Sequence, residues 1–339
     1  MTPVGLVPAA ADVAYGVDIG GTKVLGVALG TAERVVAEAR VSTPGRRVDD
    51  DAGTDAAAVG RAVAAVVDQL DAALGRGDAP PAALGVGAPG MLDRTGHLRF
   101  APNLPQAHGI DWNTLIGREV PGRRILIEND ANFAALAEHR LGAAQGHAHV
   151  LMVTLGTGIG GGLIIDGRLQ VGGHGFAGEI GHMVVDPAGP PCPCGRRGCW
   201  ERYASGGGLG VLAREAALAG RLPEVVRLAG GDAESVRGED VSAAALAGDD
   251  DARRVVQEVG WWVGFGLANL VCVLDPQCIV LGGGLVTAGD LLLDAARASF
   301  AELVEGGSAR PETVIVTAAF GERAGAVGAA LAARHGGLW

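Results

Sequence analysis

Apolar and polar residues follow one another along the chain in short blocks that are typical of buried strands and amphipathic helices. Val13–Asp18 is an apolar run that ends in a glycine turn, and Lys23–Leu29 is a second run, so together they predict a β-hairpin. Residues 55–74 place their apolar side chains on one face of a helix, namely Val59, Val63, Val66, Val67, Leu70 and Leu74. Buried strands are predicted at 83–88 and 124–128, and a helix at 131–141.

The second half of the chain repeats this order. Val150–Leu155 and Gly162–Ile165 predict another hairpin, and further elements follow it. These are helices at 207–219, 241–247, 252–274 and 324–334, and strands at 278–281 and 313–317. The pattern predicts an α/β protein of two lobes, each of which opens with a hairpin whose turn is rich in glycine.

We expect a small N-terminal lobe over residues 12–134 and a large C-terminal lobe over residues 135–323, with the boundary near residues 129–135. The closing helix, within 324–339, is expected to cross back onto the first lobe. Residues 1–11 are expected to be disordered.

The charge balance limits the possible partners. The 339 residues carry a formal net charge of −11, which argues against a nucleic-acid surface because phosphate binding needs clustered Lys and Arg.

No signal peptide is visible near Met1. The longest uncharged run, Val259–Leu274, is shorter than the roughly 20 residues of a spanning helix. It predicts a buried helix between two lobes, with Cys272 and Cys278 as small apolar core residues. We therefore expect a cytoplasmic protein with no membrane partner.

A cysteine cluster carries the most specific chemistry. Cys192, Cys194 and Cys199 fall within eight positions, and His182 lies ten residues upstream of Cys192. Four such ligands fill the tetrahedral shell of Zn²⁺ with no open position, which is the mark of a structural site. A disulfide plus a free thiol is the alternative, and a reducing cytoplasm disfavours it. The residues 182–199 are thus predicted to form a zinc loop.

Polar residues flank the zinc loop. Glu179 and His182 enter it, and Glu201 follows two residues after Cys199. A metal-rigidified loop presents polar groups in fixed positions, as a sugar-binding pocket requires, because each hydroxyl must meet a fixed partner.

Three glycine turns suggest phosphate binding. Asp18-Ile-Gly20-Gly21-Thr22-Lys23 joins two predicted strands, and its glycines allow backbone N–H groups to approach a phosphate closely. No Ser or Thr follows Lys23, so this is not a Walker A loop. The turn within 155–162, which contains Thr157 and Gly158, matches G-x-G-x-x-G, but a strand follows it instead of the helix of a dinucleotide site. Gly282–Gly284 form the third turn.

Asp130 follows Glu128-Asn129 at a predicted strand end. Capping of the next helix is one role for this Asp. Alternatively, a carboxylate facing a cleft accepts the proton of a hydroxyl nucleophile, as phosphoryl transfer requires. Asn103 lies in a loop, and its amide both donates to and accepts from sugar hydroxyls, although turn formation is the simpler role.

Over almost its full length the chain resembles the ROK family of repressors and sugar kinases. The motifs that carry the resemblance are Asp18–Lys23, Glu128-Asn-Asp-Ala-Asn132, Leu155–Gly162, Glu179-x-x-His182, Cys192-x-Cys-Gly-x-x-Gly-Cys-x-Glu201 and Leu281–Gly284. Within the family they are most similar to those of bacterial, actinobacterial-type ATP-dependent glucokinases.

The resemblance implies a two-lobed, actin-like ATPase fold of the ribonuclease H-like type, with an interlobe cleft, and transfer of the γ-phosphate of ATP to the 6-hydroxyl of D-glucose. Asp130 would be the general base. The sugar-binding residues would be Asn103, Asn129, Asp130, Glu179, His182 and Glu201. Nucleotide would be held by Asp18 (near Mg²⁺), Gly20, Gly21, Thr22, Lys23, Thr157, Gly158, Gly283 and Gly284. His182 would bind zinc with one ring nitrogen and the sugar with the other.

Several alternatives stay open. The same pocket residues serve other hexoses and N-acetylhexosamines in this family, including fructose, mannose, N-acetylglucosamine and N-acetylmannosamine. The loop from Leu104 to Asp111 is longer than the family pattern, which leaves the preferred sugar less determined. A sugar-sensing regulator is disfavoured because only 17 residues precede Asp18, and polyphosphate as donor lacks a basic channel. The family implies a homodimer or homotetramer.

Overall fold

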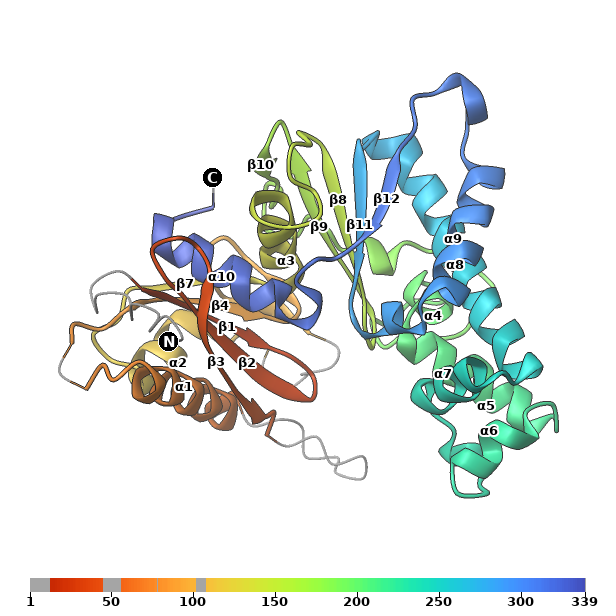
Figure 1. Ribbon diagram of the computed structural model, residues 1–339, viewed down its shortest axis with the longest axis horizontal. Coiled ribbons are helices and arrows are strands. Elements are labelled where there is room, and N and C mark those ends of the chain that lie inside the picture. The colour runs from red at the N-terminus through yellow and green to blue at the C-terminus, as the bar shows by residue number, and fades with distance from the viewer. Residues whose placement is uncertain (1–12, 45–55, 78, 102–107, 339) are drawn as a thin grey trace, which may run out of the picture. The chain divides into compact units, whose positions relative to one another are not determined.

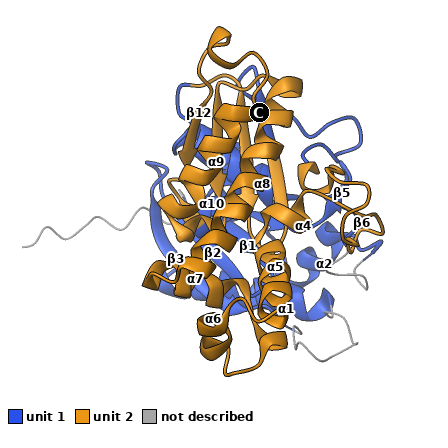
Figure 2. Ribbon diagram, turned by 90° about the vertical axis from the view of Figure 1, so that its right-hand side faces the viewer, with its two compact units in different colours: residues 1–146, 162–178, 322–339 blue, residues 147–161, 179–321 orange. Residues whose placement is uncertain are grey.

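The computed structural model describes residues 13–44, 56–77, 79–101 and 108–338, and its elements are labelled in Figure 1. The chain divides into two compact units (Figure 2). Unit 1 comprises residues 1–146, 162–178 and 322–339, and unit 2 comprises residues 147–161 and 179–321. The C-terminal segment therefore returns to the unit that contains the N-terminal hairpin. The predicted boundary at 134/135 falls inside a helix, α3 (Asp130–Arg140).

Unit 1 contains a five-stranded sheet in the order β3-β2-β1-β4-β7. Its strands are β1 (Ala14–Ile19), β2 (Lys23–Leu29), β3 (Val35–Ser42), β4 (Ala83–Ala88) and β7 (Ile125–Asn129). The first three strands are antiparallel, whereas β1, β4 and β7 run parallel. Because parallel strands end at the same edge, Asp18, Gly87 and Glu128 lie in neighbouring register positions.

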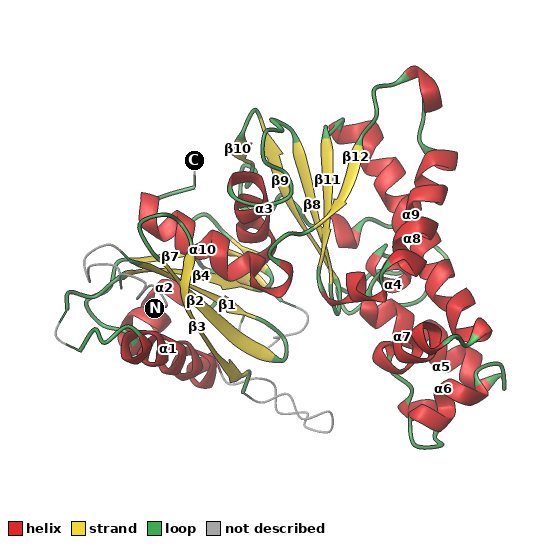
Figure 3. Ribbon diagram, in the orientation of Figure 1, coloured by secondary structure: helices red, strands yellow, loops and turns green. Residues whose placement is uncertain are grey.

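Helices cover both faces of this sheet (Figure 3). On one face α1 (Ala56–Ala73) packs against Gly26, where a Cβ would lie 2.3 Å from a methyl group of Val66. On the other face α10 (Ala324–His335) packs against Gly16 and Gly85, where a Cβ would lie about 2 Å from backbone carbonyl oxygens of that helix. The missing side chains let α10 sit directly on the strands, and α3 packs beside it.

Unit 1 also contains the two-stranded sheet of β5 (Met91–Leu92) and β6 (Leu98–Phe100) and the helix α2 (Trp112–Glu119). Helix α2 packs against α1 and β7. Asp111 caps α2 by accepting hydrogen bonds from two backbone N–H groups. Trp112 is fully buried in the core of the unit.

The second sheet has the order β10-β9-β8-β11-β12. Its strands are β8 (Val150–Leu155), β9 (Ile159–Ile165), β10 (Arg168–Leu169), β11 (Cys278–Gly282) and β12 (Val314–Thr317). The helices of unit 2 are α4 (Glu201–Ala204), α5 (Gly206–Leu218), α6 (Pro223–Leu228), α7 (Gly238–Ala247), α8 (Asp250–Leu274) and α9 (Asp290–Leu303).

Helix α8 is the long apolar helix that the sequence predicts to be buried. By length and composition it passes the test for a membrane span, but 56% of its most apolar window is buried inside the molecule. It packs closely on α9 because Gly264 has no side chain, and a Cβ there would lie 1.9 Å from Ser299 Oγ. Helices α8 and α9 both belong to unit 2.

The strong hydrophobic patterns give correct elements, with ends shifted by at most three residues. The hairpins, α1, β4, α8 and α10 are all confirmed. Weaker patterns are missed, notably β3 and α9. The side chains of β3 are mostly half-buried or exposed, so the strand lacks an apolar run. Cys278 is buried as expected, but the core role predicted for Cys272 is wrong because this residue is exposed near the end of α8.

Candidate active site

Asp18 lies near the carboxyl end of β1, directly before the first glycine turn. Its Oδ1 atom is shielded from solvent and has no hydrogen-bond partner among the described residues. Burial raises the pKa of the Asp18 carboxyl, the negative charge of Asp130 raises it further, and Lys23 opposes both effects. An unsatisfied buried carboxylate oxygen of this kind suits a cation.

Two glycines make room for the Asp18 carboxylate. A Cβ at Gly325, in the first turn of α10, would lie 2.9 Å from Asp18 Cγ and Oδ2. A Cβ at Gly87 on β4 would lie 3.4 Å from Asp18 Oδ1 and from the Cα atom of Asp130. The two aspartates therefore flank Gly87 at one edge of the sheet. No pattern in the sequence connects Gly325 with this site, because the contact joins opposite ends of the chain.

Asp130 is the first residue of α3 and follows β7. Burial raises the pKa of its carboxyl, against hydrogen bonds from the backbone N–H of Ala131 and from its own N–H. The Ala131 nitrogen lies 2.8 Å from Asp130 Oδ1. A carboxylate with a raised pKa beside a second carboxylate has the properties of a general base.

The capping role considered for Asp130 belongs to its neighbour. Asn129 is the N-cap of α3, and its Oδ1 accepts hydrogen bonds from the backbone N–H groups of Ala131 and Asn132. Its Nδ2 donates to the carbonyl oxygen of Gly90 over 3.2 Å. Most of the polar capacity of the Asn129 side chain is thus used within the protein, and Asn129 is the N-cap while Asp130 shares only the N–H of Ala131 with it.

The first glycine turn is closed by a hydrogen bond of 3.0 Å from Gly20 N to Lys23 O. The hydroxyl of Thr43 donates to Gly20 O over 2.7 Å and supports the turn from the end of β3. Gly21 and Thr22 are exposed at its tip. The Lys23 ammonium forms an ion pair with Glu322, which lies just before α10. Glu322 is absent from the predicted site residues, because nothing in its local sequence pattern marks it.

The second glycine turn joins β8 and β9, and Thr157 is exposed on it. A hydrogen bond of 3.0 Å from Gly156 N to Gly158 O closes the turn. The start of α5 is attached to it, because Gly206 N donates to Gly156 O over 2.8 Å and Gly207 N to Thr157 O over 3.1 Å. A strand follows the turn, as expected, so the G-x-G-x-x-G match does not form a dinucleotide site.

The third turn lies beside the second. Gly283 follows β11 and has a φ of +88°, a conformation that favours glycine. A Cβ there would lie 2.4 Å from the carbonyl oxygen of Leu155, the last residue of β8. Nothing lies within 4 Å of a Cβ at Gly284, which starts a short 3₁₀ helix. The ends of β8 and β11 thus bring two glycine turns together within unit 2.

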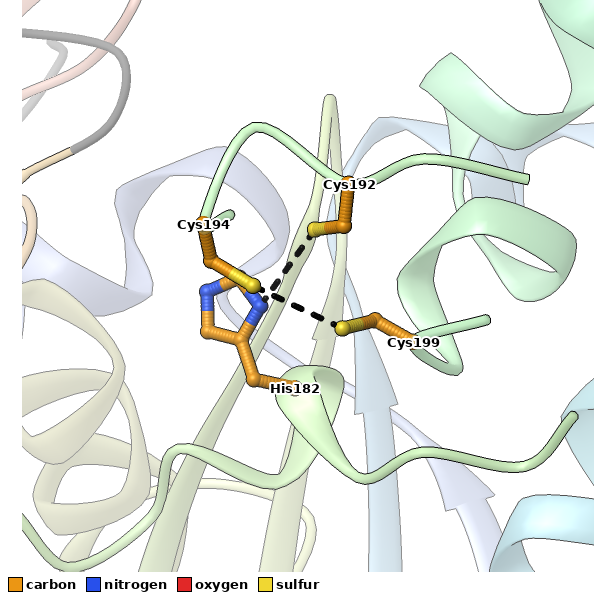
Figure 4. Close-up of side chains that lie close together, drawn as sticks. All are labelled: His182, Cys192, Cys194 and Cys199. Carbon is orange, nitrogen blue, oxygen red and sulfur yellow. Dashed lines mark hydrogen bonds between the residues drawn. The ribbon is translucent and has the colours of Figure 1, made fainter. Parts of the chain in front are cut away.

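The four predicted zinc ligands converge. The Nδ1 or Nε2 atom of His182 and the sulfur atoms of Cys192, Cys194 and Cys199 all lie within 4.8 Å of one another (Figure 4). Cys192 Sγ is 3.8 Å from His182 Nδ1, and Cys194 Sγ is 3.6 Å from Cys199 Sγ. The cysteines are free, and 3.6 Å is far beyond the S–S bond length of about 2.05 Å. The donor set therefore fits tetrahedral zinc.

Tight backbone packing shapes the loop that carries the ligands. A Cβ at Gly198 would lie 1.5 Å from the carbonyl oxygen of Asp186, and the φ of Gly198 is +64°. Arg196 Nη2 donates to the carbonyl oxygen of His182 over 2.8 Å. Burial raises the pKa of the Cys192 and Cys199 thiols, so these groups become thiolates only where a cation compensates their charge. Both packing and electrostatics suit a bound metal ion.

Two carboxylates lie against the histidine of this cluster. His182 Nδ1 is 3.5 Å from Glu201 Oε1, and His182 Nε2 is 3.9 Å from Glu179 Oε2. The Nδ1 atom also lies 3.8 Å from Cys192 Sγ, which favours Nδ1 as the ligand atom. The structure thus brings together Glu179, His182 and Glu201, as the sequence predicts.

The candidate residues fall into two groups. Unit 1 holds Asp18, the first glycine turn, Asn129 and Asp130, and unit 2 holds the other two glycine turns and the residues around the metal ligands. Asn103 and residues 104–107 of the loop after it lie outside the described residues.

Comparison with known proteins gives consistent results. The model of the ROK family matches residues 14–335. The chain is 37% identical to a glucokinase of Streptomyces coelicolor over 94% of its own length and 97% of the relative. It is 32% identical to the N-acetylgalactosamine kinase AgaK of Shewanella sp., over 94% of this chain and 95% of the relative.

Among solved structures, a ROK family glucokinase from Streptomyces griseus in complex with glucose and AMPPNP is similar, with a TM-score of 0.84. It shares 37% sequence identity, and the match covers 95% of this chain and 99% of the other. The family similarity therefore extends over both units.

Proposed function

The chain belongs to the ROK family, and we propose that it is an ATP-dependent glucokinase that converts D-glucose and ATP to glucose 6-phosphate and ADP. The observation that carries the mechanism is the pair of Asp18 and Asp130 on either side of Gly87, where desolvation raises the pKa of both carboxyls. The similarity to a glucokinase that binds glucose and AMPPNP supports the choice of both substrates.

The proposed step is an in-line phosphoryl transfer. The glucose 6-hydroxyl oxygen forms a bond to the γ-phosphorus, the bond from that phosphorus to the bridging oxygen breaks, and ADP leaves. Asp130 accepts the hydroxyl proton on a carboxylate oxygen, which its raised pKa favours. The hydroxyl proton thus ends on Asp130, and the electron pair of the broken P–O bond leaves with ADP.

Nucleotide binding is assigned to the three glycine turns. Gly20, Gly21, Thr22, Lys23, Thr157 and Gly158 would hold the phosphates, and Gly283 and Gly284 would lie beside the adenosine. Asp18 would hold Mg²⁺, because its shielded Oδ1 atom has no other partner among the described residues. When bound, Mg²⁺ neutralises negative charge on the phosphates.

Sugar binding is assigned to Asn103, Asn129, Asp130, Glu179, His182 and Glu201. Zinc, held by His182, Cys192, Cys194 and Cys199, would fix the positions of the last three of these without contact with the phosphates. The fit of the four donor atoms supports this structural role. The proposal extends to a cytoplasmic homodimer or homotetramer without nucleic-acid or membrane partners.

A kinase for another sugar is the second candidate, because a relative at 32% identity is an N-acetylgalactosamine kinase. Discrimination between close sugars depends on a few hydrogen bonds. The decisive assay is ADP release with ATP and Mg²⁺ on glucose, mannose, fructose, N-acetylglucosamine, N-acetylmannosamine and N-acetylgalactosamine. Preferred turnover of glucose supports the proposal, whereas preference for an N-acetylhexosamine would replace it with the second candidate.

A further inference from the structure

Glu201 touches the second glycine turn as well as the metal ligands. A Cβ at Gly158 would lie 2.5 Å from Glu201 Oε2 and 3.6 Å from its Cδ atom, and it would meet no other side chain within 4 Å among the described residues. The φ of Gly158 is not positive, so its backbone does not by itself require glycine. The space at this position is therefore taken up by the Glu201 carboxylate.

The other oxygen of this carboxylate is also constrained. Glu201 Oε1 lies 3.1 Å from Cys192 Sγ and 3.5 Å from His182 Nδ1. A carboxylate pushed away from position 158 would have to move toward these metal-ligand residues or leave its place. Gly158 and the ligand cluster thus hold the carboxylate from two sides.

The backbone around Glu201 is fixed on both sides. Before it, Trp200 is fully buried and donates from Nε1 to the carbonyl oxygen of Trp262 over 2.7 Å. The Trp200 ring occupies space left by Gly266 on α8, where a Cβ would lie 2.0 Å from the ring. After it, the Ser205 hydroxyl lies 2.6 Å from the carbonyl oxygen of Glu201. The main chain therefore cannot shift easily to relieve a contact at the carboxylate.

We propose that Gly158 is a positioning residue for the acceptor sugar, because its missing side chain seats the Glu201 carboxylate between the second glycine turn and the metal-ligand cluster. The inference rests on the proposed function, in which Glu201 binds glucose. It gives this turn a second task beside phosphate binding. It also explains why the turn is tied to the segment after Glu201, through Gly206 and Gly207.

The same turn offers a matched control. Gly156 also has no positive φ, and nothing lies within 4 Å of a Cβ at that position. G156A therefore adds a methyl group to the turn without touching Glu201. Any effect that the two variants share is a property of the turn, and any effect confined to G158A acts through Glu201.

The test measures glucose and AMPPNP dissociation constants separately by calorimetry on full-length, zinc-loaded wild type, G158A, G156A, E201A and G158A/E201A, with KM values for glucose and ATP alongside. We expect G158A to weaken glucose binding about 10- to 100-fold, the range of one charge-assisted hydrogen bond, with zinc content within about twofold of wild type and with a smaller loss of AMPPNP affinity than of glucose affinity. G156A should keep the glucose affinity. In the E201A background, G158A should add no further loss.

The double variant keeps the test valid if G158A alone folds poorly, because E201A removes the carboxylate atoms that the added methyl group would meet. Unchanged glucose affinity in G158A, or a loss that adds in full to that of E201A, would overturn the inference. If the wild type itself neither bound nor phosphorylated glucose, the proposed function would fail first, so the two failures are distinguishable.

Discussion

The carboxylates of unit 1 and those of unit 2 are held by different means. Asp18 and Asp130 lie on either side of Gly87, and desolvation raises the pKa of both carboxyls. Glu179 and Glu201 instead lie against His182, within a loop fixed by the metal ligands. In the proposed function, the first arrangement would supply a proton acceptor and a position for a cation, whereas the second would present polar groups to the sugar. Variants in the two units should therefore affect different kinetic constants.

The largest effect is expected for D130N in unit 1. Asn cannot accept the proton of the 6-hydroxyl, so kcat should fall by about 10³-fold or more, while the glucose dissociation constant stays within about threefold. D290N is the matched control, because Asp290 is likewise the first residue of a helix, α9, but is exposed. Steady-state kinetics and calorimetry measure both constants, and an unchanged kcat would remove Asp130 as the base.

C194S should have the opposite pattern in unit 2. Serine is a poor zinc ligand, so we expect zinc content to fall and the glucose dissociation constant to rise about 10- to 100-fold. The exposed Cys272 supplies the control C272S, which should keep the zinc content and the glucose dissociation constant of the wild type. Zinc is measured by elemental analysis and glucose by calorimetry. A zinc-free variant with normal glucose affinity would show that recognition does not need the metal.

The dependence of kcat/KM on pH tests the general base proposed in unit 1, Asp130. Burial raises the pKa of Asp130 to about 6, and only its ionised form accepts a proton. As the pH falls through about 6, kcat/KM for glucose should decline, by about tenfold per pH unit at the lower end. The residual activity of D130N should lack this decline. A wild-type profile that is flat down to about pH 5 would contradict the assignment.

The smallest effect is expected at the first glycine turn. E322Q removes the ion-pair partner of Lys23, and because such exposed pairs contribute about 0.2–1 kcal/mol, KM for ATP should change by at most about fivefold. The glucose affinity and kcat should change less. The exposed Glu312 supplies the control E312Q. A large loss of glucose affinity in E322Q would mean that the division of roles between the units is wrong.

The sequence predicted those parts of the site that are marked by a pattern of neighbouring residues. The spacing of Cys192, Cys194 and Cys199 with His182 gave the ligand set, and the apolar runs gave the strands before each glycine turn. Asp130 was placed correctly at a strand end, but the cap of α3 proved to be Asn129. A one-residue assignment of this kind depends on side-chain geometry at the junction, which residue type alone does not determine, since Asn and Asp are both good caps.

What the sequence determined by itself is short-range: periodicity marks an element, and ligand spacing marks a metal loop, because both act over a few neighbouring residues. The tertiary structure alone decided the long-range contacts. It brought Gly325 of α10 to Asp18, Gly266 of α8 to Trp200, and Gly158 to Glu201. In each pair a glycine leaves space for a side chain far away in the sequence. A glycine carries no side chain that could indicate its partner, so only the packed structure identifies it.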